Sequence, residues 1–442
     1  MAYSVGIVSL GCAKNRVDAE MIMYNLRQGG YTLKSDAALS DVAIINTCGF
    51  IESAKQESIN EILELAKLKE EGKIKAIVVT GCLSERYQHE IMKEIPEVDA
   101  VIGIGANESI CEILEEVLNG KKKESFPDKL CLPLEGGRIQ STEPFYAYIK
   151  IAEGCNNCCT YCAIPMIRGK LRSRKIENIV DEAKTLVKNG VKEINLIAQD
   201  TSVYGLDLYN KLMLAELLNK LCEINDLKWI RILYCYPDRI TDELLHTIAD
   251  NDKIIKYIDL PLQHCNKDIL QNMNRRGSKE SLEELINKIR TIIPNVVLRT
   301  TLITGFPGET KENFEELSEF VNDMKFERLG CFAYSAEEGT IAAELDNQLD
   351  EDIKNHRAEI IMEQQALIME EFCKNQVGKE IDVLVHGYDR YAECFFGRSA
   401  YDAPEVDPCV FIQKGEKKPQ IGDIIKVKIT DYIDCDLIGE FL

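Results

Sequence analysis

The chain has 442 residues, of which 45% are hydrophobic and 29% charged, and its net charge at pH 7 is −21. A chain of this length should form about three domains, and its 17 cysteines indicate metal ligation or reduced thiols rather than disulfides. Because it has no apolar run of about 18 residues and no basic signal-peptide start, we expect a cytoplasmic protein without a membrane span, and its acidity favours a basic protein partner over bulk nucleic acid.

Residues 1–107 alternate between strand and helix patterns, which predicts an open parallel α/β sheet with helices on its faces. The strands are expected at residues 5–10, 42–46 and 76–80, and the helices at residues 17–26 and 59–68. One cysteine follows each strand and stands beside a glycine, namely Cys12, Cys48 and Cys82. Because the carboxyl ends of parallel strands lie along one edge of a sheet, these thiols could converge on one site, although any single one could be an ordinary buried cysteine.

The next motif is a cysteine-rich loop. It contains Cys155, Cys159 and Cys162 in a Cys-x3-Cys-x2-Cys register, which suits an iron–sulfur cluster because each thiolate can reach a different iron. One iron of a 4Fe-4S cluster would then stay open for a small molecule. Cys158 permits a second register with Cys155 and Cys162, and spacing alone does not exclude it. A structural zinc site or a group of buried inert thiols is less favoured, because zinc would want four closed ligands and core packing does not need so many cysteines.

A linker is expected at residues 108–142, and strand and helix patterns alternate again over residues 143–345. Six strands are predicted, at residues 147–151, 193–198, 229–233, 257–260, 296–303 and 328–332. Six such units predict an incomplete (β/α)6 TIM-like barrel, with cofactor chemistry at the carboxyl ends of its strands. Residues 346–376 then predict a connecting helix, and the short strand patterns of residues 377–442 predict a small β-barrel.

The cysteine-rich loop and the segments after it, Thr160 to Pro165 and Arg168 to Arg174, resemble the methylthiotransferase branch of the radical S-adenosylmethionine enzymes. The surroundings of the three N-terminal cysteines are similar to the N-terminal domain of the same branch. These two motif sets lie far apart in the chain, so their agreement is more specific than either set alone.

This resemblance implies two 4Fe-4S clusters. In the family, the open iron of the first cluster binds the amino and carboxylate groups of S-adenosylmethionine, and an electron from that cluster cleaves the cofactor to a 5'-deoxyadenosyl radical. The ligands of this cluster would be Cys155, Cys159 and Cys162, with Cys158 as a bystander. The auxiliary cluster handles the sulfur that is inserted, and its ligands would be Cys12, Cys48 and Cys82.

Three further residues are candidates for contacts with S-adenosylmethionine. Gln199 and Asp200 follow the second barrel strand and could hydrogen-bond the ribose hydroxyls or the amino group, although Asp200 could equally be a helix N-cap. Arg299 lies within the fifth strand, where a charged side chain must face a polar cavity or pair with a carboxylate, so it is a candidate for the cofactor carboxylate. His264 follows the fourth strand and could donate to the substrate or the cofactor, although a structural hydrogen bond is favoured. No catalytic residue is assigned beyond the clusters.

The C-terminal segment bears on the substrate. Its position resembles that of the TRAM domain, usually thought of as RNA-binding, yet residues 377–442 contain eight Lys or Arg against thirteen Asp or Glu, a balance that repels phosphate. Residues 397–407 resemble the branch that modifies small-subunit ribosomal protein S twelve. This implies methylthiolation of the β-carbon of an aspartate in that protein, with an external electron donor, and argues against tRNA as the partner.

Two alternatives remain open from the sequence. One is a tRNA adenosine methylthiotransferase, which would use the same chemistry. The other, more distant alternative is an iron–sulfur electron carrier or sensor, which would not need a six-unit barrel.

Overall fold

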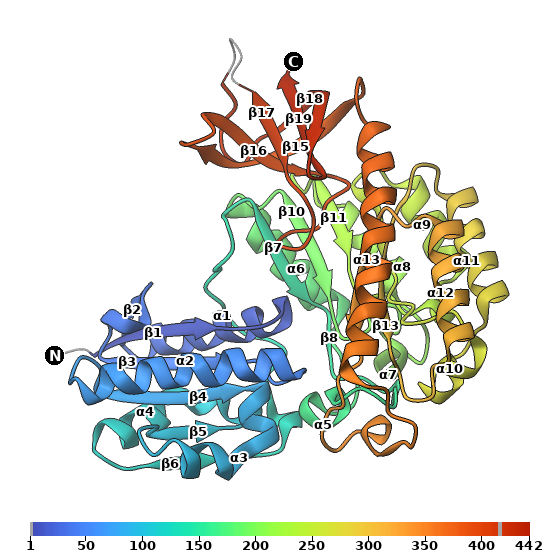
Figure 1. Cartoon of the computed structure of the whole chain (residues 1–442). Helices are drawn as coiled ribbons and strands as arrows, with labels where there is room; N and C mark the ends of the chain where they lie inside the picture. Colours follow the sequence, from blue (N-terminus) through green and yellow to red (C-terminus); the bar gives the residue numbers. More distant parts are fainter. Residues whose placement is uncertain (1–2, 414–417) are drawn as a thin grey trace.

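Three sheets organise the fold, and the computed structural model describes residues 3–413 and 418–442. Two of the sheets have six strands, and the third closes into a barrel of five strands (Figure 1). The expected α/β class is therefore confirmed, with an open N-terminal sheet, an incomplete central barrel and a small C-terminal β-barrel. None of the described helices is both long enough and apolar enough to cross a membrane.

The N-terminal sheet is parallel and has the strand order β2-β1-β3-β4-β5-β6. Its strands are β1 (Ser4–Ser9), β2 (Thr32–Lys34), β3 (Val42–Thr47), β4 (Ala76–Gly81), β5 (Ala100–Ile102) and β6 (Lys123–Ser125). Strands β3 and β4 are buried along their whole length, as their apolar runs require when helices cover both faces of a parallel sheet. The covering helices are α1 (Ala13–Gln28), α2 (Glu52–Glu70), α3 (Cys82–Glu94) and α4 (Ile110–Leu118).

This sheet extends further along the chain than the predicted boundary at residue 107. The segment expected to be a linker, residues 108–142, contains α4, which packs against α1, and the edge strand β6, which pairs with β5. A strand of three residues is too short to show an apolar alternation, which explains the difference.

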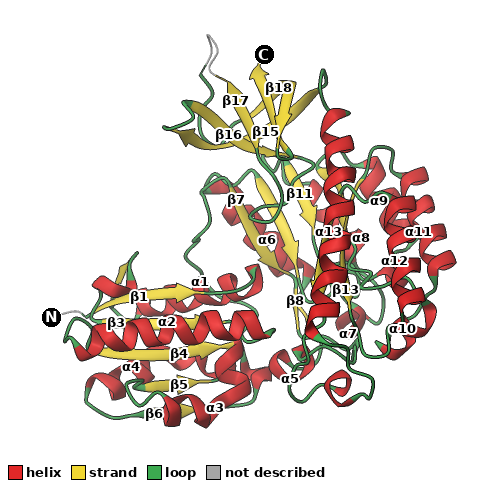
Figure 2. Cartoon of the chain, in the orientation of Figure 1, coloured by secondary structure: helices red, strands yellow, loops and turns green. Residues whose placement is uncertain are grey.

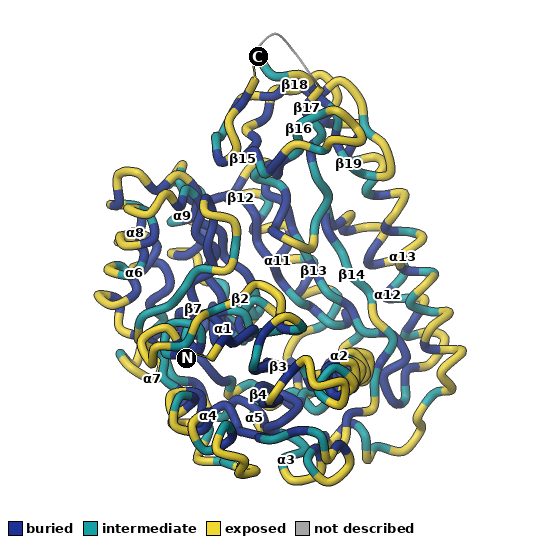
Figure 3. Tube along the Cα trace, turned by 90° about the vertical axis from the view of Figure 1, so that its left-hand side faces the viewer, coloured by how far each residue is buried: buried dark blue, intermediate teal, exposed yellow. Residues whose placement is uncertain are grey.

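The central sheet is also parallel, with the order β14-β13-β12-β11-β10-β7, and within the described residues it does not close on itself. All six predicted strands are confirmed, as β7 (Tyr146–Lys150), β10 (Glu193–Ile197), β11 (Trp229–Ile232), β12 (Ile254–Asp259), β13 (Val297–Thr304) and β14 (Arg328–Ala333). The main helices are α6 (Ile176–Lys188), α8 (Leu214–Cys222), α9 (Asp242–Asp250), α11 (Lys279–Ile292) and α12 (Lys311–Met324). They cover the outer face of the strands (Figure 2). Strands β7, β10 and β11 are buried along their whole length, whereas β14 is mostly half-buried (Figure 3).

Shorter elements shape the carboxyl end of the central sheet. They are β8 (Ala152–Glu153), β9 (Arg172–Ser173), α5 (Ile164–Arg168), α7 (Leu206–Tyr209) and α10 (Lys267–Asn272). Strands β8 and β9 pair with each other on either side of the cysteine-rich loop. The loop is therefore fixed at both ends.

The C-terminal region follows the long helix α13 (Glu351–Lys374), which packs against β14 and α12. The small barrel has the strand order β15-β16-β17-β19-β18. Its strands are β15 (Glu380–Asp389), β16 (Cys394–Ser399), β17 (Val410–Gln413), β18 (Ile424–Ile433) and β19 (Asp436–Phe441). Both the connecting helix and the five strands agree with the sequence pattern.

The small barrel packs at the amino ends of the central strands (Figure 2). Buried ion pairs stabilise this contact. Arg398 on β16 donates to both carboxylate oxygens of Glu193, the first residue of β10. Arg328 at the start of β14 donates to Asp402 at 2.6 Å. The opposite, carboxyl ends of the central strands therefore face the N-terminal sheet (Figure 1).

Candidate functional site

The three N-terminal cysteines lie at equivalent positions on neighbouring strands. Cys12 is the N-cap of α1 after β1, Cys48 follows β3, and Cys82 is the first residue of α3 after β4. A Cβ built on Gly11 would lie 2.8 Å from Cys48 Sγ, and the charges of Cys12 and Cys48 both act on Cys82. The fold thus brings together the trio that the sequence analysis selected, here called the auxiliary trio.

Glycines beside the auxiliary trio make this convergence possible. Gly11 has a φ of +86° and Gly81 a φ of +101°, a region that side-chain-bearing residues rarely adopt. A Cβ on Gly81 would lie 2.4 Å from the Thr47 carbonyl oxygen, and one on Gly49 would lie 2.7 Å from Leu83 Cα. The strand ends can approach so closely only because these positions lack a side chain.

Two thiols of the auxiliary trio, those of Cys48 and Cys82, are affected by burial. Burial raises the pKa of the Cys82 thiol to about 11, although the neighbouring Arg168 guanidinium opposes this shift. Burial also raises the pKa of Cys48. A buried thiol becomes a thiolate ligand when a metal replaces its proton, so this donor set fits an iron–sulfur cluster.

The cysteine-rich loop brings together a second trio, Cys155, Cys159 and Cys162, here called the barrel trio. The charges of Cys159 and Cys155 act on Cys162, and burial raises the pKa of Cys155 to about 11 and that of Cys162 to about 12. Backbone N–H groups stabilise the sulfur atoms, for example that of Asn157, which donates to Cys155 Sγ at 3.4 Å. Arg275 Nη1 donates to Cys159 Sγ at 3.9 Å.

Cys158 stands apart from the barrel trio. It is exposed, its φ is +52°, and its carbonyl oxygen accepts a hydrogen bond from Asn274 at 2.9 Å. Its neighbour Cys159 has a half-buried side chain that contacts Arg275. This backbone supports the register with Cys159, which stays a prediction.

Neither trio is arranged around a single metal ion. Within residues 3–413 and 418–442, no group of three or more His, Cys, Asp or Glu side chains could hold one ion. A four-iron cluster requires a wider arrangement of ligands, because each of three thiolates binds a separate iron. Two trios of neighbouring thiols fit this requirement.

Gln199 and Asp200 lie beside the barrel trio. Gln199 Nε2 donates to Glu153 Oε1 at 2.5 Å, while its Oε1 is buried without a hydrogen-bond partner among the described residues. Asp200 accepts from Asn157 Nδ2 at 2.8 Å and from Ser202 N at 3.0 Å. The unpaired amide oxygen is a free acceptor next to the cysteine-rich loop, as a cofactor amino or hydroxyl group would require.

Arg299 lies next to two carboxylates. Its Nη1 lies 3.3 Å from Asp259 Oδ1, and its Nε lies 3.9 Å from Asp407, which belongs to the C-terminal region. Of the two surroundings expected for this side chain, the structure therefore provides carboxylate partners. His264 is fully buried, with its Nδ1 accepting from Asn266 N at 2.9 Å, which is the structural hydrogen bond expected for it.

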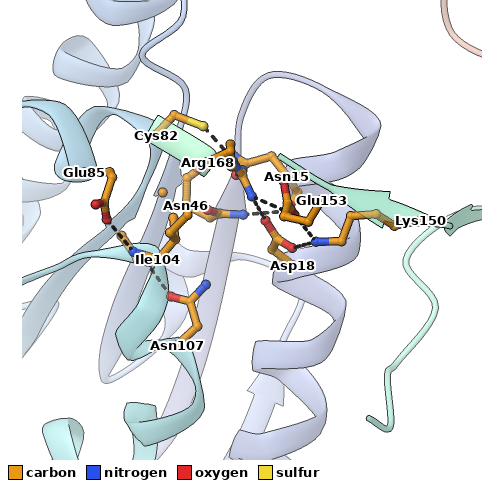
Figure 4. Close-up of polar contacts among 12 residues, drawn as sticks. Asn15, Asp18, Asn46, Cys82, Glu85, Ile104, Asn107, Lys150, Glu153 and Arg168 are labelled. Carbon is orange, nitrogen blue, oxygen red and sulfur yellow. Dashed lines mark hydrogen bonds and ion pairs between the residues drawn. The ribbon is translucent and has the colours of Figure 1, made fainter. Parts of the chain in front are cut away.

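A buried polar network that the sequence analysis did not identify runs from Cys82 of the auxiliary trio to Glu153, which precedes the cysteine-rich loop (Figure 4). Arg168, only 2% exposed, comes from α5 but donates to Cys82 Sγ at 3.3 Å and to Asp18 Oδ2 at 2.5 Å. Lys150 donates to Asp18 and to Glu153, which stands two residues before Cys155. The network thus connects a thiol of the N-terminal sheet with the root of the cysteine-rich loop.

A second contact between these regions lies on the other side of the site. Glu337, which follows β14, accepts from Arg86 Nη1 at 2.9 Å and pairs with Lys55 at 3.2 Å. Glu338 accepts from Tyr87 Oη at 2.9 Å. The N-terminal sheet is therefore held against the carboxyl end of the central barrel at two separate places.

Three family models match the chain in succession. Residues 4–103 match "Uncharacterized protein family UPF0004", residues 149–321 match the "Radical SAM superfamily", and residues 377–442 match the "TRAM domain". Each match falls on a different one of the three sheets.

Similar proteins extend over the whole chain. A protein of a Thermoanaerobacter species named "Ribosomal protein uS12 methylthiotransferase RimO" is 48% identical over 439 residues, which is 99% of this chain and 100% of that protein. A protein of the same name from Desulforamulus reducens is 49% identical over 440 residues, covering 99% of each.

Among solved structures, the radical S-adenosylmethionine methyltransferase TsrM from Kitasatospora setae gives a TM-score of 0.57 at 13% identity and covers 75% of both chains. The cobalamin-dependent radical enzyme OxsB gives 0.52 at 13% identity, covering 82% of this chain and 56% of that one. At these identities the solved structures show the fold alone. The full-length identity to the curated relatives shows more: the chain belongs to the RimO family of radical S-adenosylmethionine methylthiotransferases.

Proposed function

We propose that this protein methylthiolates the β-carbon of an aspartate in ribosomal protein uS12, using S-adenosylmethionine and two 4Fe-4S clusters. Identity of 48% over 99% of the chain to proteins named for that activity supports the substrate. The observation that supports the mechanism is the pair of cysteine trios, which belong to different parts of the fold, with the buried Arg168 network running from Cys82 to Glu153 at the start of the cysteine-rich loop.

In this proposal each trio holds one cluster and leaves one iron open. Cys155, Cys159 and Cys162 hold the cluster that binds S-adenosylmethionine, and the auxiliary trio holds the second cluster. When bound, the clusters and cofactor supply the electron, the radical and the sulfur, because an unactivated C–H bond lies beyond side-chain acid–base chemistry.

The protein's own side chains order this site. Asn157 and Arg239 both contact Asp200, at 2.8 and 3.3 Å, and so tie the cysteine-rich loop to the end of β10. The free Oε1 of Gln199 is the candidate acceptor for S-adenosylmethionine, with Asp200 beside it. Arg299 is the third candidate, although its pairs with Asp259 and Asp407 would have to open before it could reach a cofactor carboxylate.

The proposed partner is a basic protein, which suits a chain of net charge −21. An external electron donor would complete the reaction, and modification of a ribosomal protein supports the proposal that the protein acts in the cytoplasm. The acidic C-terminal region disfavours the tRNA alternative, because acidic surfaces repel phosphate.

The test is anaerobic reconstitution of both clusters, followed by reaction with a uS12-derived peptide or with tRNA. We expect methylthiolation of the peptide aspartate and none of tRNA. Activity on tRNA alone would refute the proposed substrate, and absence of S-adenosylmethionine cleavage would favour an electron carrier or sensor.

A further inference from the structure

Lys14 extends from the N-terminal sheet towards the barrel. It lies in the first turn of α1, two residues after Cys12, and is 9% exposed. Its Nζ lies 3.4 Å from the ring centroid of Tyr234, which follows β11 of the central sheet. The ammonium group therefore sits between the two sheets, where a cation–π contact holds it.

This ammonium has no carboxylate at ion-pair distance among the described residues, unlike the other buried lysines. Lys55 pairs with Glu337 at 3.2 Å, Lys150 with Glu153 at 2.6 Å, and Lys354 with Glu351 at 2.7 Å. The carboxylate that acts on Lys14 from further away is Glu153, which is already occupied by Lys150 and Gln199. Tyr234 and the Cys12 thiol also favour the charged ammonium, but neither is a carboxylate. Because burial of a charge without an ion-pair partner is costly, an anionic group of the substrate would stabilise the ammonium at this position.

The surroundings of Lys14 place that anion between the trios. Gly11 and Cys12, which precede it in the chain, are exposed, and Tyr234 is half-buried, so the ammonium lies next to residues that solvent reaches. Glu153, on the far side, stands two residues before Cys155. A group bound here lies near both an auxiliary thiol and the root of the cysteine-rich loop.

The backbone fixes the ring that supports the ammonium. Tyr234 has a φ of +62°, a strained value for a residue with a side chain. Its N–H donates to Asp259 Oδ2 at 2.9 Å, and its carbonyl oxygen accepts from Thr201 N at 2.9 Å. Strain that is held in place by two hydrogen bonds is typical of a functional site.

We propose that Lys14 binds the side-chain carboxylate of the substrate aspartate, and so selects a carboxylate over a neutral side chain. The inference rests on the proposed function, since it names the group that recognises that substrate. The reacting β-carbon is bonded directly to the carboxylate carbon, so an ammonium that fixes the carboxylate also fixes the position of the carbon. A charge-assisted hydrogen bond of this kind is stronger than one between neutral groups.

The experiment measures binding, without turnover. Reconstituted enzyme with S-adenosylmethionine, but without reductant, is titrated with a fluorescent uS12-derived peptide that contains the target aspartate, and with the same peptide carrying asparagine there. We expect wild-type enzyme to bind the aspartate peptide about 10- to 100-fold more tightly. Lys14→Met should bind both peptides about equally, whereas Lys14→Arg should keep part of the preference.

A matched control removes an exposed lysine from the same sheet. Lys67 lies on α2 and is exposed, so Lys67→Met makes the same chemical change away from the site and should leave the preference unchanged. Comparing the binding of the two peptides to wild-type enzyme also tests the inference, and this comparison does not depend on the folding of any variant.

Two results would overturn the role of Lys14. One is equal binding of both peptides by wild-type enzyme; the other is an undiminished aspartate preference in Lys14→Met. A shift in the midpoint potential of the auxiliary cluster together with that undiminished preference would identify Lys14 as a counter-ion of the cluster instead. Failure of wild-type enzyme to modify the aspartate peptide under reducing conditions would refute the proposed function. Even then, loss of the preference for the aspartate peptide in Lys14→Met would establish the carboxylate site.

Discussion

At the scale of single residues, the cysteines could be predicted and their supporting network could not. The six cysteines were recognisable because each trio has a regular spacing or a regular position after a strand. Arg168 and Asp18 are 150 residues apart in the chain, and an ion pair over that separation leaves no local pattern. Lys14 was not singled out from the sequence either, because its lack of a carboxylate partner is a property of the folded chain.

Arg168 gives the first prediction. Replacing it by methionine would leave Cys82 without its guanidinium donor and Asp18 with Lys150 as its remaining cation. Removing one member of a buried charged network costs about 3–5 kcal/mol, which should appear as a lower urea midpoint. Arg168→Lys should recover only part of this, because an ammonium cannot reproduce the planar fork of a guanidinium.

The control for Arg168 is Arg172→Met. Arg172 lies on β9 and donates to the carbonyl oxygens of Leu130 and Leu132, at 2.7 and 3.0 Å. Among the described residues it has no hydrogen bond to a cysteine sulfur and no ion pair, so its loss should be milder. Equal destabilisation by both substitutions would contradict the special role given to Arg168.

The two adjacent cysteines of the loop give the second prediction. Cys159→Ala should abolish S-adenosylmethionine cleavage because it removes a cluster ligand, whereas Cys158→Ala should leave cleavage intact because that side chain is exposed and apart from the trio. The measurement is 5'-deoxyadenosine formed with dithionite as reductant. The reverse pattern would establish the other register.

At the scale of elements, apolar strands of six residues were predictable and strands of three residues were not. The first four residues of β3 and of β4 are apolar, and both strands are buried throughout, so their composition alone identifies them. Strands β2, β5 and β6 have three residues each, and their pairing depends on a neighbour already being in place. The docking of β15 and β16 on the central barrel also depends on distant partners, such as Arg398 with Glu193.

His386 on β15 makes that docking sensitive to pH. Its ring stacks on Tyr146 and meets Phe145 edge-on, with centroids 5.8 and 5.0 Å away. Burial first, and then the charge of Arg398, lower the pKa of His386 to about 4, while Glu193 acts in the opposite direction. In the unfolded chain a histidine takes up its proton near pH ~6.5. Between these two values the unfolded chain binds more protons, so stability should fall as the pH falls.

The measurement is the thermal midpoint at pH 7 and at pH 5. We expect a decrease in the native protein and a smaller decrease in His386→Phe, which keeps the aromatic contacts but cannot be protonated. Identical pH dependence in the two proteins would show that other groups govern the acid response.

At the scale of the whole molecule, the central feature is that the two trios belong to different sheets. The N-terminal sheet contacts the central barrel through the Arg168 network and through Glu337, which pairs with Arg86 and Lys55. Spacing in the sequence could indicate two clusters. It could not indicate that the edge of the N-terminal sheet that carries one trio faces the edge of the central barrel that carries the other. That relation depends on ion pairs between residues far apart in the chain.

The most direct test of the account is the iron content of the reconstituted protein and of two triple variants, one for each trio. Wild-type protein should bind about eight iron atoms per chain and each triple alanine variant about four. The variant lacking Cys12, Cys48 and Cys82 should still cleave S-adenosylmethionine but should not methylthiolate the uS12 peptide. Full iron content in either triple variant, or methylthiolation without the auxiliary trio, would contradict the account.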